Sequence, residues 1–533
     1  MRVAKGKPNA ESDRLRLRWR PAAAWIALIL GALGLIRLID LSSSQERNIL
    51  AAVVFLVGLL GLAVWWTAIS GLPWRTRLLG LAAAACAGGV FCLFFHVRGV
   101  TGDLVPIIEF RWRPSPRPLE TAPPPTARET AGRPIRFGQD FPGFLGPDRN
   151  AVVEGAPLAA DWSARPPEIV WRRPIGAGWS GFAIAGGLAY TQEQRGEREF
   201  VTCYDAATGK QIWACGYRAR YAATLAGEGP RCAPAIADGK VFALGATGVL
   251  SALEAKSGRL LWRRRITEDA GAKVPEWGFA GSPLVWKGLV IVSAGGRDGR
   301  SLLAYRAADG EPAWAAGDAP ASYSSPFLAE LSGRRLVLIF NADRISAHNP
   351  QTGRVEWEYP WDARNPHVAE PVLVASNRVV FSSGYGVGAE LLETRFENGW
   401  EVRRIWKSRA LKAKFANFIA WRGFLYGLDD GVLACVDLKD GKRRWRRGRY
   451  GHGQMLRRGD LLLVTGERGE LFLVHPEPSG LVELGRFRVF NVKSWNPPAL
   501  SGEALLWRND REAACVRIPL QNAASTPRAL GGS

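Results

Sequence analysis

The first hundred residues contain three long apolar runs, Ala22–Ile39, Ile49–Ile69 and Leu78–Val97. The second and third are about 20 residues long, enough for a helix to cross a hydrocarbon core of roughly 30 Å. Arg37 lies near the end of the first run, where it can pair with Asp40 or extend to the interface. A signal peptide is the alternative for that run, but we find no small-residue cleavage site, and two further runs follow. The pattern therefore predicts three transmembrane helices.

Arginines flank these runs unevenly. They concentrate before the first run, in Arg14–Arg20, and between the second and third runs, at Arg75 and Arg77. Cytoplasmic flanks are enriched in Lys and Arg, so the N-terminus and the loop at 70–77 are expected in the cytoplasm. Three spans then deliver the rest of the chain to the periplasm or cell exterior of a bacterium. If the first run did not span, the large domain would instead be cytoplasmic.

Beyond residue 98 the apolar runs end and short strands begin. Residues 106–136 contain eight prolines, typical of a semi-rigid extended spacer. From about residue 137, apolar segments of four to six residues alternate with Gly-containing turns. In residues 232–262, for example, the pattern predicts four strands separated by turns at Asp238-Gly239 and Ser257-Gly258.

These strands recur as a repeat that ends in tryptophan. The clearest copies are Tyr204–Trp213, Leu253–Trp262, Tyr305–Trp314 and His348–Trp357, each with Gly four residues before the Trp. Periods of about 40–50 residues with four strands each are typical of propeller blades. We expect each anchor to lie in an outermost strand and to cover the neighbouring blade. The anchors are Trp171, Trp213, Trp262, Trp314, Trp357, Trp406 and Trp445.

The blade count follows from the anchors. An eroded copy of the repeat ends at Leu484 in place of Trp. With the seven tryptophans this makes eight anchors, from Trp171 to Leu484, separated by seven intervals. Residues 485–520 supply further strands but no final Trp strand, and the strand around Trp171 can fill that vacancy. The predicted fold class is all-β: an eight-bladed β-propeller with tryptophan-docking repeats, preceded by three transmembrane α-helices. The expected divisions are a basic cytoplasmic N-terminus (1–21), the helices (22–97), a Pro-rich linker (98–136), the propeller (137–520) and a flexible tail (521–533).

The Asp-Ala-x-Thr-Gly-Lys-x-x-Trp repeat resembles that of the PQQ-like (BamB/quinoprotein-type) eight-bladed β-propeller family. The lead-in Phe141–Asn150 is similar to that of membrane-associated or secreted PQQ-like repeat proteins. The resemblance implies the fold over roughly 137–520 but no particular activity, because the family holds both dehydrogenases and the BamB assembly lipoprotein. Its dehydrogenases use pyrroloquinoline quinone (PQQ), Ca²⁺, an Asp base and, in many members, a disulfide between adjacent cysteines. This chain has no adjacent cysteines and no lipobox cysteine.

Most signatures of catalysis are missing from the sequence. The five histidines have no metal-ligand spacing, and neither a nucleophile elbow nor a phosphate-binding loop occurs. Gly295–Gly299 carries one carboxylate and is interpreted as a hairpin turn rather than a calcium loop. Cys203 and Cys215 flank a turn, which leaves a cross-strand disulfide and free buried thiols both open.

Residues just before the first strand of each blade are expected to converge on one mouth of the central channel. Such a ring of aromatic and polar side chains suits a planar or sugar-like ligand. The alternative is that its polar groups only satisfy backbone at strand starts. Glu370 and Asn417 are the one pair nominated for a metal. The ring comprises Trp179, Arg231, Trp277, Tyr323, His367, Glu370, Asn417, His452, Trp495 and Asn496, with Ser180, Ser282 and Ser325 beside them.

Net charge adds little to this picture. The chain carries +21, and its densest arginine run is Arg443–Arg449. On a strand such residues alternate faces, which favours a solvated outer surface over a nucleic-acid site. Outside the cytoplasm the expected anionic partners are lipid headgroups or cell-wall polymers, not nucleic acid.

Two functions are compatible with the sequence. The first is a membrane-anchored periplasmic propeller that acts as a binding or scaffold module in the cell envelope, with the inner membrane and envelope proteins as partners and no certain cofactor. The second is a membrane-bound PQQ-dependent quinoprotein dehydrogenase that oxidises alcohols or sugars and needs PQQ and Ca²⁺. The missing catalytic constellation favours the first and leaves enzymatic activity uncertain.

Overall fold

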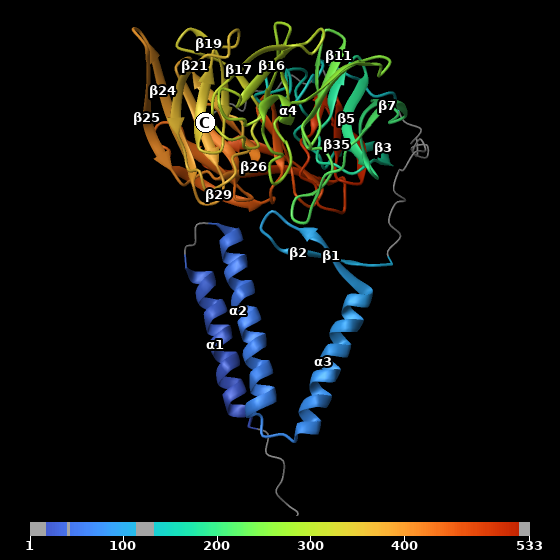
Figure 1. Cartoon of the computed structure of the whole chain (residues 1–533), viewed down its shortest axis with the longest axis vertical. Coiled ribbons are helices and arrows are strands. Elements are labelled where there is room, and N and C mark those ends of the chain that lie inside the picture. The colour runs from blue at the N-terminus through green and yellow to red at the C-terminus, as the bar shows by residue number, and fades with distance from the viewer. Residues whose placement is uncertain (1–17, 40–42, 113–132, 522–533) are drawn as a thin grey trace, which may run out of the picture. The chain divides into compact units, whose positions relative to one another are not determined.

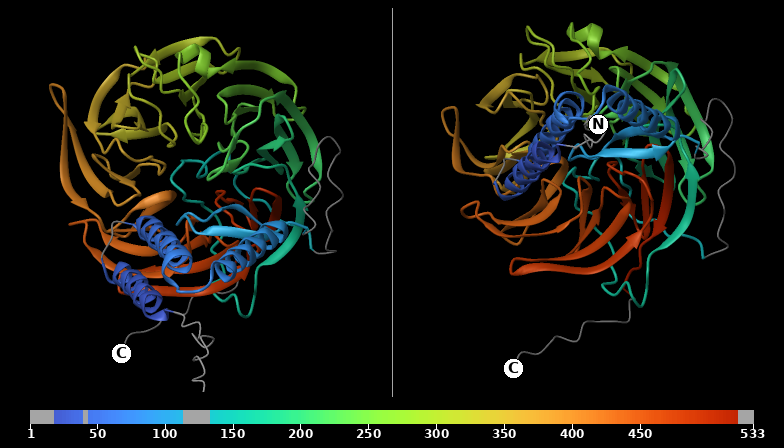
Figure 2. Two further views of the ribbon diagram at one scale, coloured as in Figure 1. Left: turned by 60° about the horizontal axis from the view of Figure 1, so that its bottom comes forward. Right: turned by 90° about the horizontal axis from the view of Figure 1, so that it is seen from below.

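The computed structural model describes residues 18–39, 43–112 and 133–521 (Figures 1 and 2). The chain divides into two compact units, Met1–Ser115 and Pro116–Ser533. Most of the basic N-terminus, the centre of the proline-rich linker and nearly all of the C-terminal tail lie outside the described residues. Each unit is described by itself.

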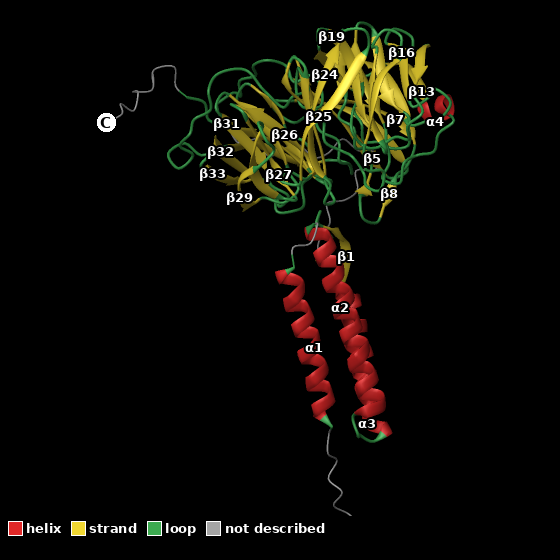
Figure 3. Ribbon diagram, turned by 90° about the vertical axis from the view of Figure 1, so that its left-hand side faces the viewer, coloured by secondary structure: helices red, strands yellow, loops and turns green. Residues whose placement is uncertain are grey.

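The N-terminal unit contains three apolar helices, coloured red in Figure 3: α1 (Trp19–Leu38), α2 (Ser44–Val64) and α3 (Trp74–Phe94). A π-helical turn, η1 (Trp65–Ile69), extends α2. The Ser43 side chain caps α2 by accepting a hydrogen bond from the Glu46 N–H. All three helices are long and apolar enough to cross a membrane, as the apolar runs predict.

A β-hairpin follows α3 directly. Its strands are β1 (Phe95–Val100) and β2 (Pro106–Phe110), which pair antiparallel. From the sequence, these residues are expected in the third apolar run, which ends at Val97, and in the Pro-rich linker at 98–136. Pro106 is compatible with pairing because it is the first residue of its strand, where proline is tolerated.

The second unit confirms the predicted eight-bladed propeller (Figures 1 and 2). Its described residues form eight four-stranded antiparallel sheets around a central channel. Blades 1 to 4 consist of β4 (Ala183–Ala185), β5 (Leu188–Arg195), β6 (Arg198–Asp205) and β7 (Gln211–Arg218); β10 (Ala235–Ala237), β11 (Lys240–Leu244), β12 (Val249–Glu254) and β13 (Leu260–Arg265); β14 (Leu284–Trp286), β15 (Leu289–Ser293), β16 (Leu302–Arg306) and β17 (Pro312–Ala316); and β18 (Phe327–Leu331), β19 (Arg334–Phe340), β20 (Arg344–His348) and β21 (Val355–Pro360).

Blades 5 to 8 continue the ring with the same up-and-down order. They consist of β22 (Val372–Ala375), β23 (Arg378–Ser383), β24 (Gly388–Phe396) and β25 (Trp400–Ser408); β26 (Ala413–Trp421), β27 (Phe424–Asp429), β28 (Val432–Asp437) and β29 (Arg443–Arg449); β30 (Gln454–Arg458), β31 (Leu461–Thr465), β32 (Glu470–Glu477) and β33 (Gly480–Arg488); and β34 (Ala499–Ser501), β35 (Ala504–Arg508) and β36 (Glu512–Arg517) with β3 (Glu168–Pro174). A short hairpin, β8 (Ala222–Ala223) and β9 (Gly227–Glu228), and the helix α4 (Ile266–Ala270) lie in connections.

Blade 8 closes the ring with strands from both ends of the propeller. The N-terminal strand β3 pairs antiparallel with β36, so that Trp171 lies opposite Cys515. This is the closure that the missing final Trp strand predicts. It leaves only short strand edges, which protects the propeller from edge-to-edge pairing.

The anchor tryptophans connect each blade to the next. In six of the seven, the indole Nε1 donates a hydrogen bond of 2.8–3.2 Å to a backbone carbonyl three residues before the turn Gly of the next blade. The turn must be glycine where the ring lies on it: Gly258 has φ +72°, and a Cβ there would come within 2.4 Å of Trp213. The seventh anchor, Trp357, is buried but its Nε1 has no partner among the described residues. The longer β24–β25 hairpin opposite it contributes Trp400, which donates to Glu356 instead.

This difference predicts unequal costs for one substitution. Trp262→Phe removes the 3.2 Å bond to the Ala307 carbonyl, whereas Trp357→Phe removes the same volume and no hydrogen bond. We expect Trp262→Phe to lower the free energy of unfolding by about 1 kcal/mol more than Trp357→Phe. Equilibrium urea unfolding of both variants checks this. Equal costs would mean that the indole hydrogen bond contributes nothing to blade docking.

The lead-in segment runs across the central channel before β3. Phe141 pairs with Ile184 of β4, the Pro142 carbonyl accepts from the second blade, and the Val153 N–H donates to the seventh. Asp140 accepts from the β4–β5 turn, at the end of the blades opposite the strand starts. Phe141 and Leu145 are buried there. The lead-in therefore crosses one end of the channel, and the predicted ligand ring lies toward the other.

Candidate ligand-binding site at the channel mouth

Three serines of the predicted ring connect neighbouring blades. The Ser180 hydroxyl donates to the Cys232 carbonyl at 2.8 Å, and the Ala233 N–H donates to Ser282 Oγ at 2.9 Å. The Ser282 N–H in turn donates to Ser325 Oγ at 3.0 Å. These side chains satisfy backbone groups where the innermost strands begin. Their role is interblade hydrogen bonding, the alternative left open by the sequence.

Glu370 continues this chain of contacts. One of its carboxylate oxygens accepts from the Ser325 N–H at 2.7 Å, and the other, Oε2, has no partner among the described residues. Burial raises the pKa of Glu370 to about 7, against the opposing charge of Arg149. Arg149 reaches the same region from the lead-in and donates to the carbonyls of Ser282 and Pro283.

The two asparagines of the ring also bind backbone. Asn417 lies inside β26 rather than before it, and its side chain donates to and accepts from Met455 at 3.1 Å. Asn496 Nδ2 donates to the carbonyls of Gly178 and Ser180 at 3.2 and 2.8 Å. Glu370 thus contacts the backbone of Ser325, and Asn417 contacts the backbone of Met455. These contacts do not direct the two side chains toward a shared metal ion.

His367 does not face the mouth as a ligand. Its ring is fully buried and stacks on Phe340 with centroids 4.3 Å apart, while Nε2 lies 2.9 Å from the Asp362 carbonyl. Burial lowers the pKa of His367 to about 4, although backbone hydrogen bonds oppose this shift. A neutral imidazole in this place packs blades 4 and 5 together.

Aromatic and cationic side chains form one side of the mouth. The Trp179 and Trp495 rings have centroids 5.1 Å apart, and Phe415 lies 5.3 Å from both Trp495 and His452. Lys493 Nζ lies over both indoles, 3.8 Å from the Trp495 centroid and 4.9 Å from that of Trp179. A cation over two tryptophan faces is a favourable arrangement.

A second group forms the other side. Trp277 stacks on Tyr323 with centroids 5.4 Å apart, and the Tyr323 hydroxyl accepts from the Trp277 N–H at 3.3 Å. Arg231 donates to the Trp277 carbonyl and lies 5.1 Å over the Tyr221 ring. The structure therefore brings together Trp277, Tyr323 and Arg231, with Tyr221 beside them.

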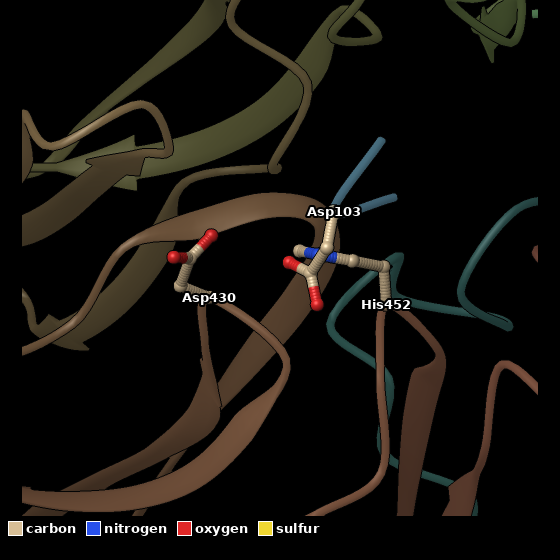
Figure 4. Close-up of side chains that lie close together, drawn as sticks. All are labelled: Asp103, Asp430 and His452. Carbon is tan, nitrogen blue, oxygen red and sulfur yellow. The ribbon is translucent and has the colours of Figure 1, made fainter. Parts of the chain in front are cut away.

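Sequence reasoning missed several mouth residues. Lys414 Nζ lies 4.9 Å from the Tyr385 centroid and 5.1 Å from that of Phe415. Asp430, in the turn after β27, lies close to His452 of the next blade (Figure 4). A carboxylate oxygen of Asp430 and a ring nitrogen of His452 lie within 4.8 Å of each other. Lys493 lies two residues before Trp495 in the loop between β33 and β34, and Lys414 lies at the start of β26. Asp430 lies on a turn, which an alignment on strand starts does not sample.

The described mouth residues of the propeller do not make up the calcium ligand set of the dehydrogenases, since Asp430 beside His452 supplies a single carboxylate. Ca²⁺ takes six to eight oxygen ligands, and a carboxylate that holds it must be available to it. Glu467 accepts from Trp495 Nε1 at 2.8 Å and from the His452 N–H, and Glu370 lies near the Arg149 cation. The seven cysteines, all within described ranges, are free. Cys203 lies opposite Trp213, and Cys215 opposite Val201, in the β6–β7 pair. We derive no catalytic step through PQQ or Ca²⁺.

Comparisons with known proteins agree with this fold. Residues 197–447 match the protein family described as outer membrane protein assembly factor BamB. The BamB of Burkholderia pseudomallei (strain K96243) is 27% identical over 218 residues, which are 39% of this chain and 52% of that protein. The quinohemoprotein alcohol dehydrogenase ADH IIB of Pseudomonas putida is 32% identical over 145 residues, 24% of this chain and 20% of that protein. The chain thus spans about half the length of the first relative and a fifth of the second.

A solved structure gives the same architecture. The quinohemoprotein alcohol dehydrogenase from Comamonas testosteroni superposes with a TM-score of 0.52 at 13% identity, covering 74% of this chain and 82% of that one. At this identity the likeness shows the fold alone. The predicted resemblance to the PQQ-like (BamB/quinoprotein-type) eight-bladed propeller repeat family is confirmed, with matches on both its BamB side and its dehydrogenase side.

Proposed function

We propose that this chain is a membrane-anchored scaffold whose propeller binds a protein or other ligand of the bacterial cell envelope at the channel mouth. The observation that carries the proposal is that the ring residues fall into two groups with different contacts. Serines, asparagines and Glu370 hydrogen-bond one blade to the next, whereas Trp179, Trp495 and Trp277 form aromatic groups beside cations. Aromatic faces with nearby cations suit binding, and nothing in them supplies a nucleophile or a metal.

The proposed location is the bacterial inner membrane, with the propeller in the periplasm or on the cell exterior. Three apolar helices and the arginine flanks support it. Alkaline phosphatase fused after Ser533 is active only outside the cytoplasm and should be active in a bacterial host. A stably expressed but inactive fusion would reverse the topology.

Mouth binding is tested by photocrosslinking in native membranes. A photoreactive amino acid at Trp495 or Trp277 should capture an envelope component, whereas the same group at Val482, exposed on β33, should not. Lys493→Ala, which removes the cation over both indoles, should weaken capture at Trp495. Equal capture at Val482 and at the mouth would contradict the proposal.

The arginine-rich strand β29 supports anion contact less than its sequence suggests. Arg443 and Arg446 lie 3.5 and 2.6 Å from the buried Asp429, and Arg444 lies 2.5 Å from Asp437. These ion pairs offset part of its charge. Lipid headgroups or cell-wall anions remain proposed partners of this outer surface, and nucleic acid is not proposed.

A quinoprotein dehydrogenase is the second candidate, because a segment of the chain is 32% identical to a quinohemoprotein alcohol dehydrogenase. Within the propeller, Asp430 beside His452 supplies one carboxylate and one imidazole, far short of the six to eight oxygen ligands of a calcium site. We therefore expect no bound chromophore after incubation with micromolar PQQ and Ca²⁺. We also expect no dye-linked oxidation of alcohols or sugars. Absorbance spectroscopy and a dye-reduction assay measure these. A stoichiometric chromophore with activity would establish the dehydrogenase instead.

A further inference from the structure

The hairpin after α3 has two chemically distinct faces. Its strands pair Phe95 with Phe110 and Val97 with Ile108, and all four side chains are exposed, from 36% for Phe95 to 61% for Val97. Alternate positions face the other side, where Arg98 and Glu109 form an ion pair of 3.1 Å. Side chains alternate across a strand, so one face is apolar and uncovered while the opposite face is polar.

The apolar face turns toward the end of α3. Phe95 stacks on Phe91 of the last helical turns, with centroids 5.0 Å apart, and Phe110 lies 6.0 Å from Phe94. Trp112 meets Phe94 edge-on at 5.0 Å. The hairpin therefore does not continue the helix into water. It folds over so that its aromatic residues gather around the helix end.

The turn of the hairpin reaches the start of α2. Asn48 Nδ2 donates to the Asp103 carbonyl at 2.8 Å, which ties the turn to the first turns of α2. The start of α2 and the end of α3 are at the same membrane surface when both helices cross. Figure 1 shows α2 and α3 diverging toward the hairpin, which bridges their two ends.

Described residues pack against α3 unevenly along its length. α3 packs closely near its start, where a Cβ on Gly80 would come within 2.3 Å of Trp66. A Cβ on Gly88 or Gly89, farther along, would meet nothing within 4 Å. In a bilayer, this part of α3 at Gly88 and Gly89 would contact lipid.

From these contacts we infer that the hairpin β1–β2 is a lipid-docking element, whose apolar face rests on the acyl–headgroup boundary between α2 and α3. The inference goes beyond the proposed scaffold function and rests on α3 crossing the membrane. At about 1.5 Å per residue, 21 residues span about 31 Å, close to the hydrocarbon thickness of roughly 30 Å. The hairpin then begins at the interface, where aromatic residues such as Trp112 are enriched. Its ion-paired face, with Arg98 and Glu109, then lies on the side away from the acyl chains.

Two adjacent isoleucines provide a matched test. Ile108 is 53% exposed on the apolar face, and Ile107 lies on the opposite face. We would place benzoylphenylalanine at each position in the full chain and reconstitute it in nanodiscs of phosphatidylethanolamine and phosphatidylglycerol. Mass spectrometry should find lipid adducts about fivefold more abundant at position 108 than at position 107, because apolar faces of interfacial elements contact acyl chains. Equal lipid yields, or protein adducts alone at position 108, would overturn the inference.

A second measurement guards against a local effect of the large photoreactive group. Ile108→Cys should react more slowly than Ile107→Cys with a membrane-impermeant maleimide in nanodiscs, above the background of wild-type chain. Equal or reversed rates would also overturn the inference. The phosphatase fusion reports separately on whether α3 spans, so failure of the topology and failure of lipid docking are distinguishable.

Discussion

Arg508→Met should lower the free energy of unfolding of the propeller by about 3–5 kcal/mol. Arg508 ends β35 in blade 8 and has no exposed surface. Its guanidinium donates to the carbonyls of Gly176 and Gln192 at 2.7 and 2.8 Å and to Thr191 Oγ1 at 3.0 Å. It therefore joins the blade that closes the ring to β5 of blade 1.

The effect is large because the groups left behind are buried. Carbonyls that lose a donor away from water cost about 1–3 kcal/mol each when nothing replaces it. Glu193 is also buried, and although burial works to raise its pKa, Arg195 and Arg508 hold that pKa below its usual value. Removing Arg508 takes away one of these two cations. Methionine fills much of the volume but supplies neither charge nor donor.

Urea unfolding of the full chain, followed by tryptophan fluorescence, measures this loss. Arg447→Met, on the exposed side of β29, is the matched control and should change stability by no more than about 0.5 kcal/mol. If both variants unfold at the same urea concentration, the Arg508 contacts do not contribute to ring closure.

The second large effect is a pH-dependent gain from Glu370→Gln. Glu370 has a pKa of about 7 in the folded chain, above its ordinary value of 4.5, because burial disfavours its ionised form. The folded state thus binds this proton more tightly, so stability falls as the pH rises from about 4.5 to about 7, and the loss is complete above that range. A shift of this size corresponds to roughly 3 kcal/mol.

Glutamine carries no charge and keeps an oxygen to accept from the Ser325 N–H. We expect Glu370→Gln to be more stable than wild type at pH 8, by up to about 3 kcal/mol, and to show no gain near pH 4.5. Thermal and urea unfolding at both pH values measure the difference. Glu401→Gln on exposed β25 serves as the control. A loss of stability at pH 8 would mean that Glu370 is ionised and favourably coupled to Arg149.

The fold was predictable because each blade carries its own local markers. The turn Gly and the anchor Trp four residues later fix the outermost strand, and the strand predicted after the Ser257-Gly258 turn is β13, Leu260–Arg265. Ring closure followed from counting the anchors. The strand around Trp171 belonged to no complete blade, and the last blade lacked its Trp strand. The hairpin at 95–110 was not predicted, because proline content dominates the interpretation of a segment whose pairing partners lie within the same short stretch.

The mouth was predictable only in part. Trp179 lies against Trp495, and Trp277 lies against Tyr323, all of them residues that precede first strands. From the sequence, Asn417 is expected just before the first strand of its blade. In the structure, that strand, β26, already begins at Ala413, and its register shifts before Phe418. Ser282 hydrogen-bonds to residues of the two adjacent blades rather than to a ligand. The sequence of a single repeat does not show which backbone groups the adjacent blades present to it.

Ring closure has a consequence for biosynthesis. β3 can pair only after β36 has been synthesised. Their paired residues Trp171 and Cys515 are about 340 residues apart in the chain. At about 5–20 residues per second, this interval lasts roughly 17–70 seconds. Throughout it, β3 lacks its partner strand while seven blades emerge. Emergence of β36 from the ribosome should therefore be the step after which protease resistance of the propeller first appears.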